Sequence, residues 1–173
     1  MFDVVQHIIL ADLPSRTKLK ELSHQGFIEL VNVSGVDLYQ LYGSDFLSQF
    51  KIAQFTFKDV FSEAPEPSGG VELSAIPYKY FTDISKEEDR QAFFQATNKV
   101  IEYLEQKKPL YLCCHQGIGR SPCVLFSALT YLYRQDYNKT LKIIKFLNPK
   151  SGMSTVSYSA VNWFQTQMGM SKQ

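Results

Sequence analysis

The sequence predicts an α/β fold in which a central, mostly parallel sheet of four to five strands is flanked by helices. The clearest sign is an unbroken apolar run at residues 109–113, which is typical of a central parallel strand covered on both faces. A second is the stretch 120–133, which is apolar nearly all round, as expected of a helix packed in a core. The 173 residues, 45% of them hydrophobic, suit one domain spanning positions 1–173.

The first third of the chain predicts short elements. Leu19 and Leu22 have helical spacing, and Gly26 follows as a residue favoured just past the end of a helix. A β-rich run comes next and is closed by Ser34 and Gly35. The expected elements are a helix at 15–25, a strand at 27–33, a short helix at 44–50 and a strand at 52–57.

The middle of the chain predicts an exposed loop, a strand and a long helix. Residues 62–70 are rich in Pro, Ser, Gly and Glu and form the loop, and 71–76 have the composition of a strand. Ser85 and Glu88 have the spacing of a capping box, so a helix should start there. Its apolar residues recur every three or four positions up to about Gln106.

Two further helices are expected after the core helix at 120–133. Residues 137–147 are amphipathic, and the Asn-Pro-Lys-Ser-Gly stretch at 148–152 ends that helix. A last helix should run over 154–167. Lys139, Lys142 and Lys145 fall three apart on the amphipathic helix, which indicates a solvated face rather than an anion site.

A cysteine and an arginine frame a glycine-containing loop between the predicted central strand and the core helix. Cys114 is followed six residues later by Arg120, with Gly117 and Gly119 between them. A free cysteine has a pKa of about 8.5 and attacks only as the thiolate, so a nucleophilic cysteine needs a positive local field. Inward-pointing backbone amides and a helix N-terminus supply that field and also bind phosphate. Arg120 adds a guanidinium that binds two phosphate oxygens at once.

The pattern therefore predicts a phosphate-binding loop with a nucleophile at its base. Cys114 is preferred to Cys113, because counting from Cys113 displaces the glycine from its place in the loop. Ser121 is expected to donate a hydrogen bond to the sulfur and to help it leave when a phosphocysteine is hydrolysed. The alternative is a purely structural, glycine-containing turn between strand and helix, in which the two thiols have no catalytic role. The predicted phosphate-binding residues are His115, Gln116, Gly117, Ile118, Gly119 and Arg120.

This loop resembles the signature H-C-x5-R-S/T of the protein tyrosine phosphatase superfamily, and the order of features over residues 71–164 resembles the small dual-specificity phosphatases. The resemblance implies a phosphatase fold and a single phosphatase domain. One position departs from the pattern: Cys113 stands where the family usually has histidine, which leaves the thiolate pKa and the rate in question, not the fold. Thr155 and Tyr158 fall in the region from which relatives line the pocket.

Cleavage of a phosphoester needs a proton on the leaving oxygen, usually from a carboxylic acid near the pocket. Asp83 is the predicted acid. It stands just ahead of the long helix, at about the separation from the nucleophile that small dual-specificity phosphatases use. The alternative role for Asp83 is to stabilise the start of that helix.

The predicted activity is hydrolysis of phosphotyrosine and phosphoserine or phosphothreonine in protein substrates through a phosphocysteine. Three alternatives are weighed. A phosphoinositide phosphatase is disfavoured because the loop at 115–119 has no lysine. An RNA 5′-triphosphatase would share the loop and can lack the acid. A non-catalytic phosphate-binding module is suggested only by Cys113.

Composition limits the other classes. A net charge of +1 argues against a nucleic-acid track, so no nucleic-acid partner is expected. We expect neither a metal nor another cofactor, since the arginine and the amides supply the positive field. There is no signal-peptide pattern and no window approaching a membrane span, and a free nucleophilic thiol suits a reducing compartment, so a cytoplasmic location is expected. A further hypothesis is that Cys113 or Cys123 traps oxidised Cys114 as a disulfide.

Overall fold

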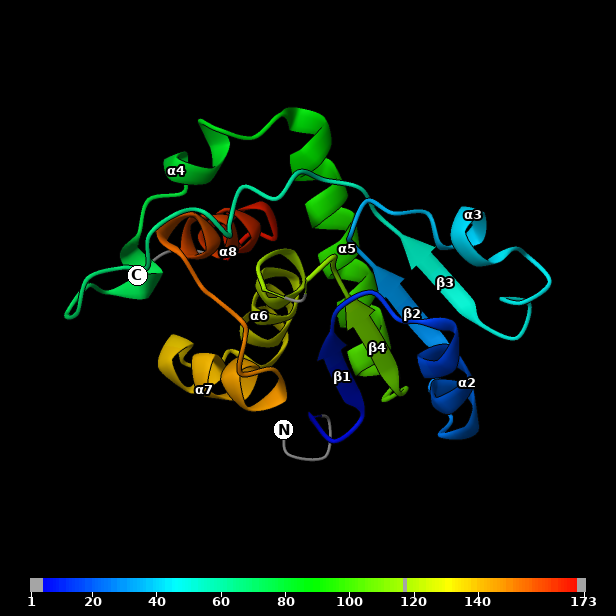
Figure 1. Cartoon of the computed structure of the whole chain (residues 1–173). Coiled ribbons are helices and arrows are strands. Elements are labelled where there is room, and N and C mark those ends of the chain that lie inside the picture. Colours follow the sequence, from blue (N-terminus) through cyan, green and yellow to red (C-terminus); the bar gives the residue numbers. More distant parts are fainter. Residues whose placement is uncertain (1–4, 117, 171–173) are drawn as a thin grey trace.

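A computed structural model describes residues 5–116 and 118–170 of the chain. Its centre is a sheet of four parallel strands in the order β1-β4-β2-β3 (Figure 1). The strands are β1 (Ile8–Ala11), β2 (Glu29–Asn32), β3 (Lys51–Gln54) and β4 (Leu110–Cys113). Because every strand runs the same way, all four carboxyl ends lie at one edge of the sheet.

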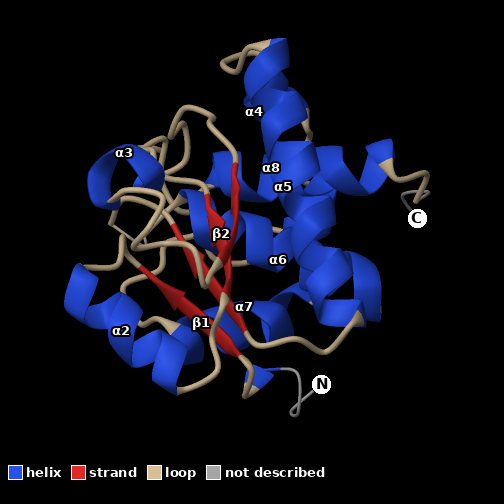
Figure 2. Cartoon of the chain, turned by 90° about the vertical axis from the view of Figure 1, so that its right-hand side faces the viewer, coloured by secondary structure: helices blue, strands red, loops and turns tan. Residues whose placement is uncertain are grey.

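Helices cover both faces of the sheet. Figure 2 shows α2 and α3 on one side of the strands and the longer helices on the other. The first group is α2 (Arg16–His24) and α3 (Leu38–Tyr42). The second group is α5 (Glu87–Glu105), α6 (Arg120–Tyr133), α7 (Tyr137–Leu147) and α8 (Thr155–Gln167). Two short elements, the 3₁₀ helix η1 (Leu73–Ala75) and α4 (Lys79–Thr82), pack against α8.

Each face of the sheet has its own hydrophobic core, because successive side chains of a strand point to opposite faces. Along β4, Tyr111 and Cys113 pack with the leucines of α2 and α3. Leu110 and Leu112 instead join the larger core made with α5, α6 and α8. The central strand is therefore buried on both sides, as its unbroken apolar sequence predicts.

Most predicted elements are present. The α/β class, the parallel sheet, the central strand and the core helix are confirmed, and α6 and α7 have the predicted bounds. Strand β1 was not predicted, since four residues are too few to show a clear period. No helix in the described part of the chain is long and apolar enough to cross a membrane.

The helix predicted at 44–50 is wrong. The helix lies earlier, as α3, where Asp37 caps it by accepting a hydrogen bond from the Tyr39 amide at 2.9 Å. Gly43, at φ +85°, ends α3. Residues 44–50 then form successive turns, with the Ser48 amide bonded to the Asp45 carbonyl.

The strand predicted at 71–76 is also wrong, because none of the strands in the described part of the chain pairs with this segment. Instead, the Nδ2 atom of Asn162 on α8 donates to the carbonyls of Leu73 at 3.0 Å and Ile76 at 2.8 Å. An asparagine side chain from a distant helix thus binds the carbonyls that a strand would present to a sheet, and η1 forms here.

The long helix begins slightly later than its capping-box pattern predicts. Its N-cap is Lys86, not Ser85. The Ser85 hydroxyl instead donates to the Phe81 carbonyl at the end of α4, a helix that the sequence did not predict. Ser85 therefore belongs to the end of α4 rather than the start of α5.

Candidate active site

The predicted phosphate-binding loop at 114–120, which we call the nucleophile loop, lies between the central strand β4 and the core helix α6. Cys114 directly follows β4, and α6 begins at Arg120. The loops that follow β2 and β3 reach the same place, since parallel strands end at one edge of the sheet. Three segments that are distant in sequence therefore meet around Cys114 and Arg120.

Cys114 is held at the base of this site. Its side chain is buried, with 2% of the residue exposed. The Ser121 hydroxyl, on the first turn of α6, donates a hydrogen bond to the Cys114 sulfur at 3.1 Å. This is the contact expected from the sequence, and such a donor stabilises negative charge on sulfur.

Arg120 is anchored on one side and unpaired on the other. Its Nη1 donates to the Ser34 carbonyl at 2.9 Å and to the Phe57 carbonyl at 3.4 Å. Its Nε is buried and has no hydrogen-bond partner among the described residues. A buried N–H without a partner is costly, so this edge of the guanidinium suits an anionic oxygen.

The site is a cavity of about 250 Å³, which we call the phosphate cavity after the ligand that the sequence predicts for it. It is several times the volume that one water occupies in the liquid, about 30 Å³, so a phosphoryl group has room. Its lining residues are Asp59, Ser62, Cys114, His115, Gln116, Ile118, Gly119 and Arg120. The structure thus brings together the predicted loop residues, except Gly117, which lies outside the described residues.

Asp59 is a lining residue that the sequence analysis missed. It lies on the loop after β3, and its Oδ1 accepts hydrogen bonds from the amides of Phe61 and Ser62, both at 3.0 Å. Its Oδ2 accepts one from the Ser62 hydroxyl. These bonds, all from its own turn, hold the carboxylate at the mouth of the nucleophile loop.

The turn at 59–62, which we call the acid loop after the carboxylic acid side chain of Asp59, packs directly against Gly119. A Cβ atom at Gly119 would lie 2.4 Å from the Ser62 hydroxyl oxygen and 3.2 Å from Asp59 Oδ1. Glycine at this position leaves space for the Ser62 hydroxyl and the Asp59 carboxylate as they stand. The acid loop and the nucleophile loop therefore form one packed unit.

Asp83, the predicted acid, lies elsewhere. It is an exposed residue at the C-cap of α4 and is not among the residues that line the phosphate cavity. One signal does point to Asp59: it follows closely on the predicted strand 52–57, at the sheet edge where α/β proteins bind ligands.

The other two cysteines are buried and differ from Cys114 in their surroundings. The Cys113 sulfur lies 3.8 Å from Asn32 Oδ1, in the core on the face of α2 and α3, whereas Cys114 belongs to the opposite core. Burial raises the pKa of the Cys113 thiol and that of Cys123, whose sulfur donates to the Ser157 carbonyl at 3.4 Å. Both are thus kept as neutral thiols. Because Cys113 and Cys114 belong to the cores on opposite faces of the sheet, Cys113 is disfavoured as the residue that would form a disulfide with oxidised Cys114.

Two residues of the last helix lie outside the phosphate cavity. Thr155 donates to the Pro65 carbonyl from its amide at 2.9 Å and from its hydroxyl at 3.2 Å. Tyr158 is buried, and burial followed by the Glu66 charge raises the pKa of its phenol to about 12. The described residues contain no group of three or more His, Cys, Asp or Glu side chains that could hold a metal ion.

The fold matches that of known phosphatase structures. Tk-PTP in its active form gives a TM-score of 0.63 at 14% identity over 92% of each chain. PTPMT1 gives 0.66 at 10% identity over 95% of this chain and 93% of that one. The human tyrosine phosphatase-like serine/threonine/tyrosine-interacting protein gives 0.65 at 9% identity over 95% of each chain. No protein-family model and no curated protein sequence matches. The chain therefore has the fold of the protein tyrosine phosphatase superfamily, as its signature loop predicts.

Proposed function

We propose that the chain is a cysteine-dependent phosphatase that hydrolyses phosphomonoesters through a phosphocysteine. One observation carries the proposal: a thiol with a hydrogen-bond donor, an arginine with an unpaired buried N–H and a carboxylate line the same cavity. These are the nucleophile, the anion-binding group and the proton donor that the reaction requires. The shared fold with known phosphatases supports the same activity.

In the first step the Cys114 thiolate attacks phosphorus in line with the leaving oxygen. The S–P bond forms as the P–O bond to the leaving group breaks. The Nε edge of Arg120 holds the equatorial phosphate oxygens, since its Nη1 is already engaged by the Ser34 and Phe57 carbonyls. A protonated Asp59 donates its proton to the leaving oxygen, which departs as an alcohol or phenol.

In the second step water replaces the sulfur. Asp59, now ionised, accepts a proton from a water molecule. The oxygen of that water attacks phosphorus, and the S–P bond breaks. The departing thiolate is stabilised by the hydrogen bond from Ser121. Inorganic phosphate leaves, and both Cys114 and Asp59 return to their starting states.

The acid assignment is tested by a matched pair of variants. Asp59→Asn should lower kcat for phosphoserine peptides by about 10²–10⁴-fold, since an alkoxide needs the proton. It should affect p-nitrophenyl phosphate far less, because nitrophenolate leaves without help. Asp83→Asn should change neither rate by more than about twofold, as it is exposed and outside the cavity. The reverse ranking would return the acid role to Asp83.

The nucleophile assignment has its own test. Cys114→Ser should abolish turnover of p-nitrophenyl phosphate while the protein still binds inorganic phosphate through Arg120 and the loop. Retained turnover would reject Cys114 as the nucleophile. Loss of turnover together with loss of phosphate binding would indicate a collapsed site, which thermal unfolding of the variant would reveal.

We propose phosphorylated proteins as the substrates, both phosphotyrosine and phosphoserine or phosphothreonine. The sequence has no recognisable equivalent of the extra loop that deepens the pocket of large tyrosine-specific phosphatases, so a broad preference is expected. A second candidate is a phosphoinositide, because one similar structure is PTPMT1 in complex with PI(5)P. The lack of lysine at 115–119 favours the protein substrate. Parallel assays on phosphopeptides and phosphoinositide vesicles decide between them.

A further inference from the structure

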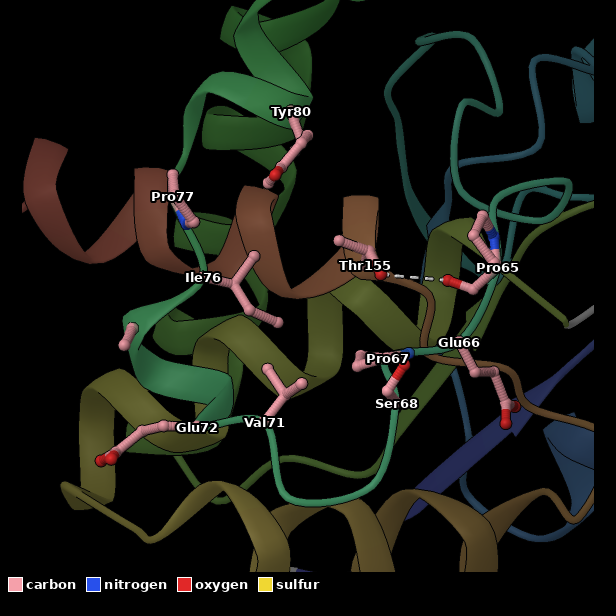
Figure 3. A pocket seen from close by; sticks show the side chains of 11 residues that line it. Pro65, Glu66, Pro67, Ser68, Val71, Glu72, Ile76, Pro77, Tyr80 and Thr155 are labelled. Carbon is pink, nitrogen blue, oxygen red and sulfur yellow. Dashed lines mark hydrogen bonds between the residues drawn. The ribbon is translucent and has the colours of Figure 1, made fainter.

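A second cavity of about 510 Å³ lies beside the acid loop (Figure 3). We call it the side groove. Most of its wall is apolar, made of Pro65, Pro67, Val71, Ile76, Pro77 and Tyr80. In Figure 3, Val71 and Ile76 lie in the middle of the groove and the Glu66 and Glu72 carboxylates lie toward opposite ends of it. Val71 and Tyr80 are 43% and 46% exposed, so this apolar surface is open to a ligand.

The side groove shares a chain segment with the phosphate cavity. Ser62 lines the phosphate cavity and Pro65 lines the side groove. Three extended residues span at most about 11 Å, so the two sites are neighbours. The Pro65 carbonyl is fixed by both hydrogen bonds from Thr155, and the Gly152 amide donates to the Ile118 carbonyl of the nucleophile loop at 2.8 Å. Residues 152–155 therefore bond to the nucleophile loop at one end and to the side groove at the other.

The charge of the side groove is negative. Glu66 and Glu72 are exposed, and neither forms an ion pair within the described part of the chain. No lysine or arginine is among the described residues that line the groove. Lys79 lies 5.8 Å from the centre of the Tyr80 ring but is not one of the lining residues. Carboxylates here would attract a basic side chain and repel an anionic lipid surface.

We propose that the side groove binds the polypeptide next to the phosphorylated residue, with an apolar side chain against Val71, Ile76 and Tyr80 and a lysine or arginine facing Glu66 or Glu72. This rests on the proposed phosphatase function and specifies its substrate class. An extended peptide rises about 3.3 Å per residue, so the span of at most about 11 Å between Ser62 and Pro65 corresponds to about three substrate residues. The apolar wall provides buried area, and the two carboxylates provide selectivity.

The test uses two sets of phosphopeptides that differ only at the three or four positions on either side of the phosphorylated residue. One set carries leucine and arginine there and the other leucine and glutamate. We expect kcat/KM to favour the basic set by about three- to tenfold, the size expected of one or two partly exposed ion pairs. In the double variant Glu66→Gln/Glu72→Gln, the ratio of kcat/KM for the basic peptides to kcat/KM for the acidic peptides should fall close to one. The control is Glu63→Gln, an exposed residue of the same loop that does not line the groove, and it should keep the preference.

Each outcome decides one of the two proposals. A double variant that keeps the preference for basic peptides overturns the groove assignment, and so does a wild-type preference for phosphoinositide vesicles over both peptide sets. Loss of p-nitrophenyl phosphate turnover in the double variant to the same extent as peptide turnover would also overturn it. Failure of the wild-type protein to hydrolyse p-nitrophenyl phosphate rejects the phosphatase function instead. In that case, peptide affinities measured on Cys114→Ser still test the groove, because binding needs no turnover.

Discussion

Gly119 is the residue at which the nucleophile loop and the acid loop touch. A Cβ atom there would overlap the Ser62 hydroxyl and press on Asp59 and the Ser62 backbone. The Ser62 hydroxyl would then have to turn away, which breaks its hydrogen bond to Asp59 Oδ2, and the Asp59 carboxylate would have to shift by a few tenths of an ångström. Misplacing a catalytic group by about 1 Å can cost about 10²-fold in rate. The absence of a side chain at this position is therefore part of the site, although glycine carries no reactive group.

Gly119→Ala should consequently lower kcat/KM for phosphoserine peptides by about 10- to 100-fold. It should also lower the free energy of unfolding by about 1–3 kcal/mol, as overpacking does. The control is Gly69→Ala, where nothing lies within 4 Å of the added Cβ and φ is not positive. Steady-state kinetics and thermal unfolding provide the two readouts. A Gly119→Ala enzyme with wild-type kinetics would mean that the acid loop is not needed in the position seen here.

The three thiols should differ sharply in reactivity. Cys113 and Cys123 are fully buried with a raised pKa, whereas Cys114 lines an open cavity. Iodoacetamide should therefore modify Cys114 first, and inorganic phosphate should slow that reaction. Cys113 and Cys123 should react only after unfolding, even at about pH 8.5, because the thiolate is the reactive form. Peptide mapping by mass spectrometry measures all three, and early labelling of Cys123 would contradict its burial.

The same two thiols give a pH dependence to stability. Each holds its proton in the fold at a pH where the unfolded chain, with a thiol pKa of about 8.5, loses it. Their contribution is fully present below that pH and is lost as the pH rises above it, because the unfolded state then binds fewer protons than the native state. The free energy of unfolding should therefore fall above about pH 8.5.

At the residue scale, the sequence predicted the groups that are close together in the chain. Cys114, Arg120 and Ser121 lie within one turn and one loop, so their spacing alone indicates how they meet. Asp59 could not be chosen in this way, because its approach to Gly119 depends on the third strand ending at the same edge as the central one. Asp83 has the separation from Cys114 that is typical of small dual-specificity phosphatases, but it lies at the end of α4 and does not line the phosphate cavity.

At the scale of elements, the loop after β2 controls the geometry of Arg120. Asn32, at the end of β2, donates from Nδ2 to the Val36 carbonyl at 2.7 Å and accepts at Oδ1 from the Ser34 amide at 3.0 Å. These two bonds shape residues 33–36. The Ser34 carbonyl, which this turn presents, is the anchor of Arg120 Nη1. Asn32 is thus a positioning residue that acts through Arg120 without lining the phosphate cavity.

Asn32→Ala should lower the free energy of unfolding by about 1–3 kcal/mol, because it leaves buried polar partners without hydrogen bonds. It should also weaken the binding of inorganic phosphate, which a purely structural role would not do. Asn98→Ala is the control, since within the described residues the Asn98 side chain bonds only to the Phe94 carbonyl of its own helix. Calorimetry of phosphate binding and denaturant unfolding provide the two readouts. Unchanged phosphate affinity in Asn32→Ala would show that Arg120 keeps its place without this turn.

Helices and strands were predictable where the local sequence, without contacts from distant segments, determines them. Helix α6 is apolar nearly all round and α7 is amphipathic, and the ends of both helices match the prediction. The segment 71–76 was misread, because its backbone is bound by Asn162 from the far end of the chain. No local pattern contains that contact. The same is true of α4, whose first turn is fixed by the Ser159 hydroxyl donating to the Pro77 carbonyl and accepting from the Phe81 amide.

At the scale of the whole molecule, the acid loop rests on an aromatic cluster that joins distant helices. Phe57 and Phe61 flank Asp59 in the sequence, and the centres of their rings lie 6.4 Å apart. Phe61 stacks on Phe81 of α4 at 5.9 Å and contacts Phe93 of α5 at 6.1 Å. Phe81 in turn meets Trp163 of α8 at 5.5 Å. The position of Asp59 therefore depends on packing contributed by α4, α5 and α8.

A pair of core substitutions separates this role from stability in general. Phe61→Leu and Phe126→Leu each remove an aromatic ring from the same buried core, and each should lower the free energy of unfolding by about 1–2 kcal/mol. The ring contacts of Phe126 are with Tyr137 and Tyr158 and not with Phe57 or Phe61 beside Asp59. Only Phe61→Leu should therefore lower kcat for phosphoserine peptides, by about tenfold, while p-nitrophenyl phosphate turnover falls much less, because the loosened loop impairs protonation of the leaving group. Equal kinetic losses in the two variants would mean that the cluster stabilises the fold without positioning Asp59.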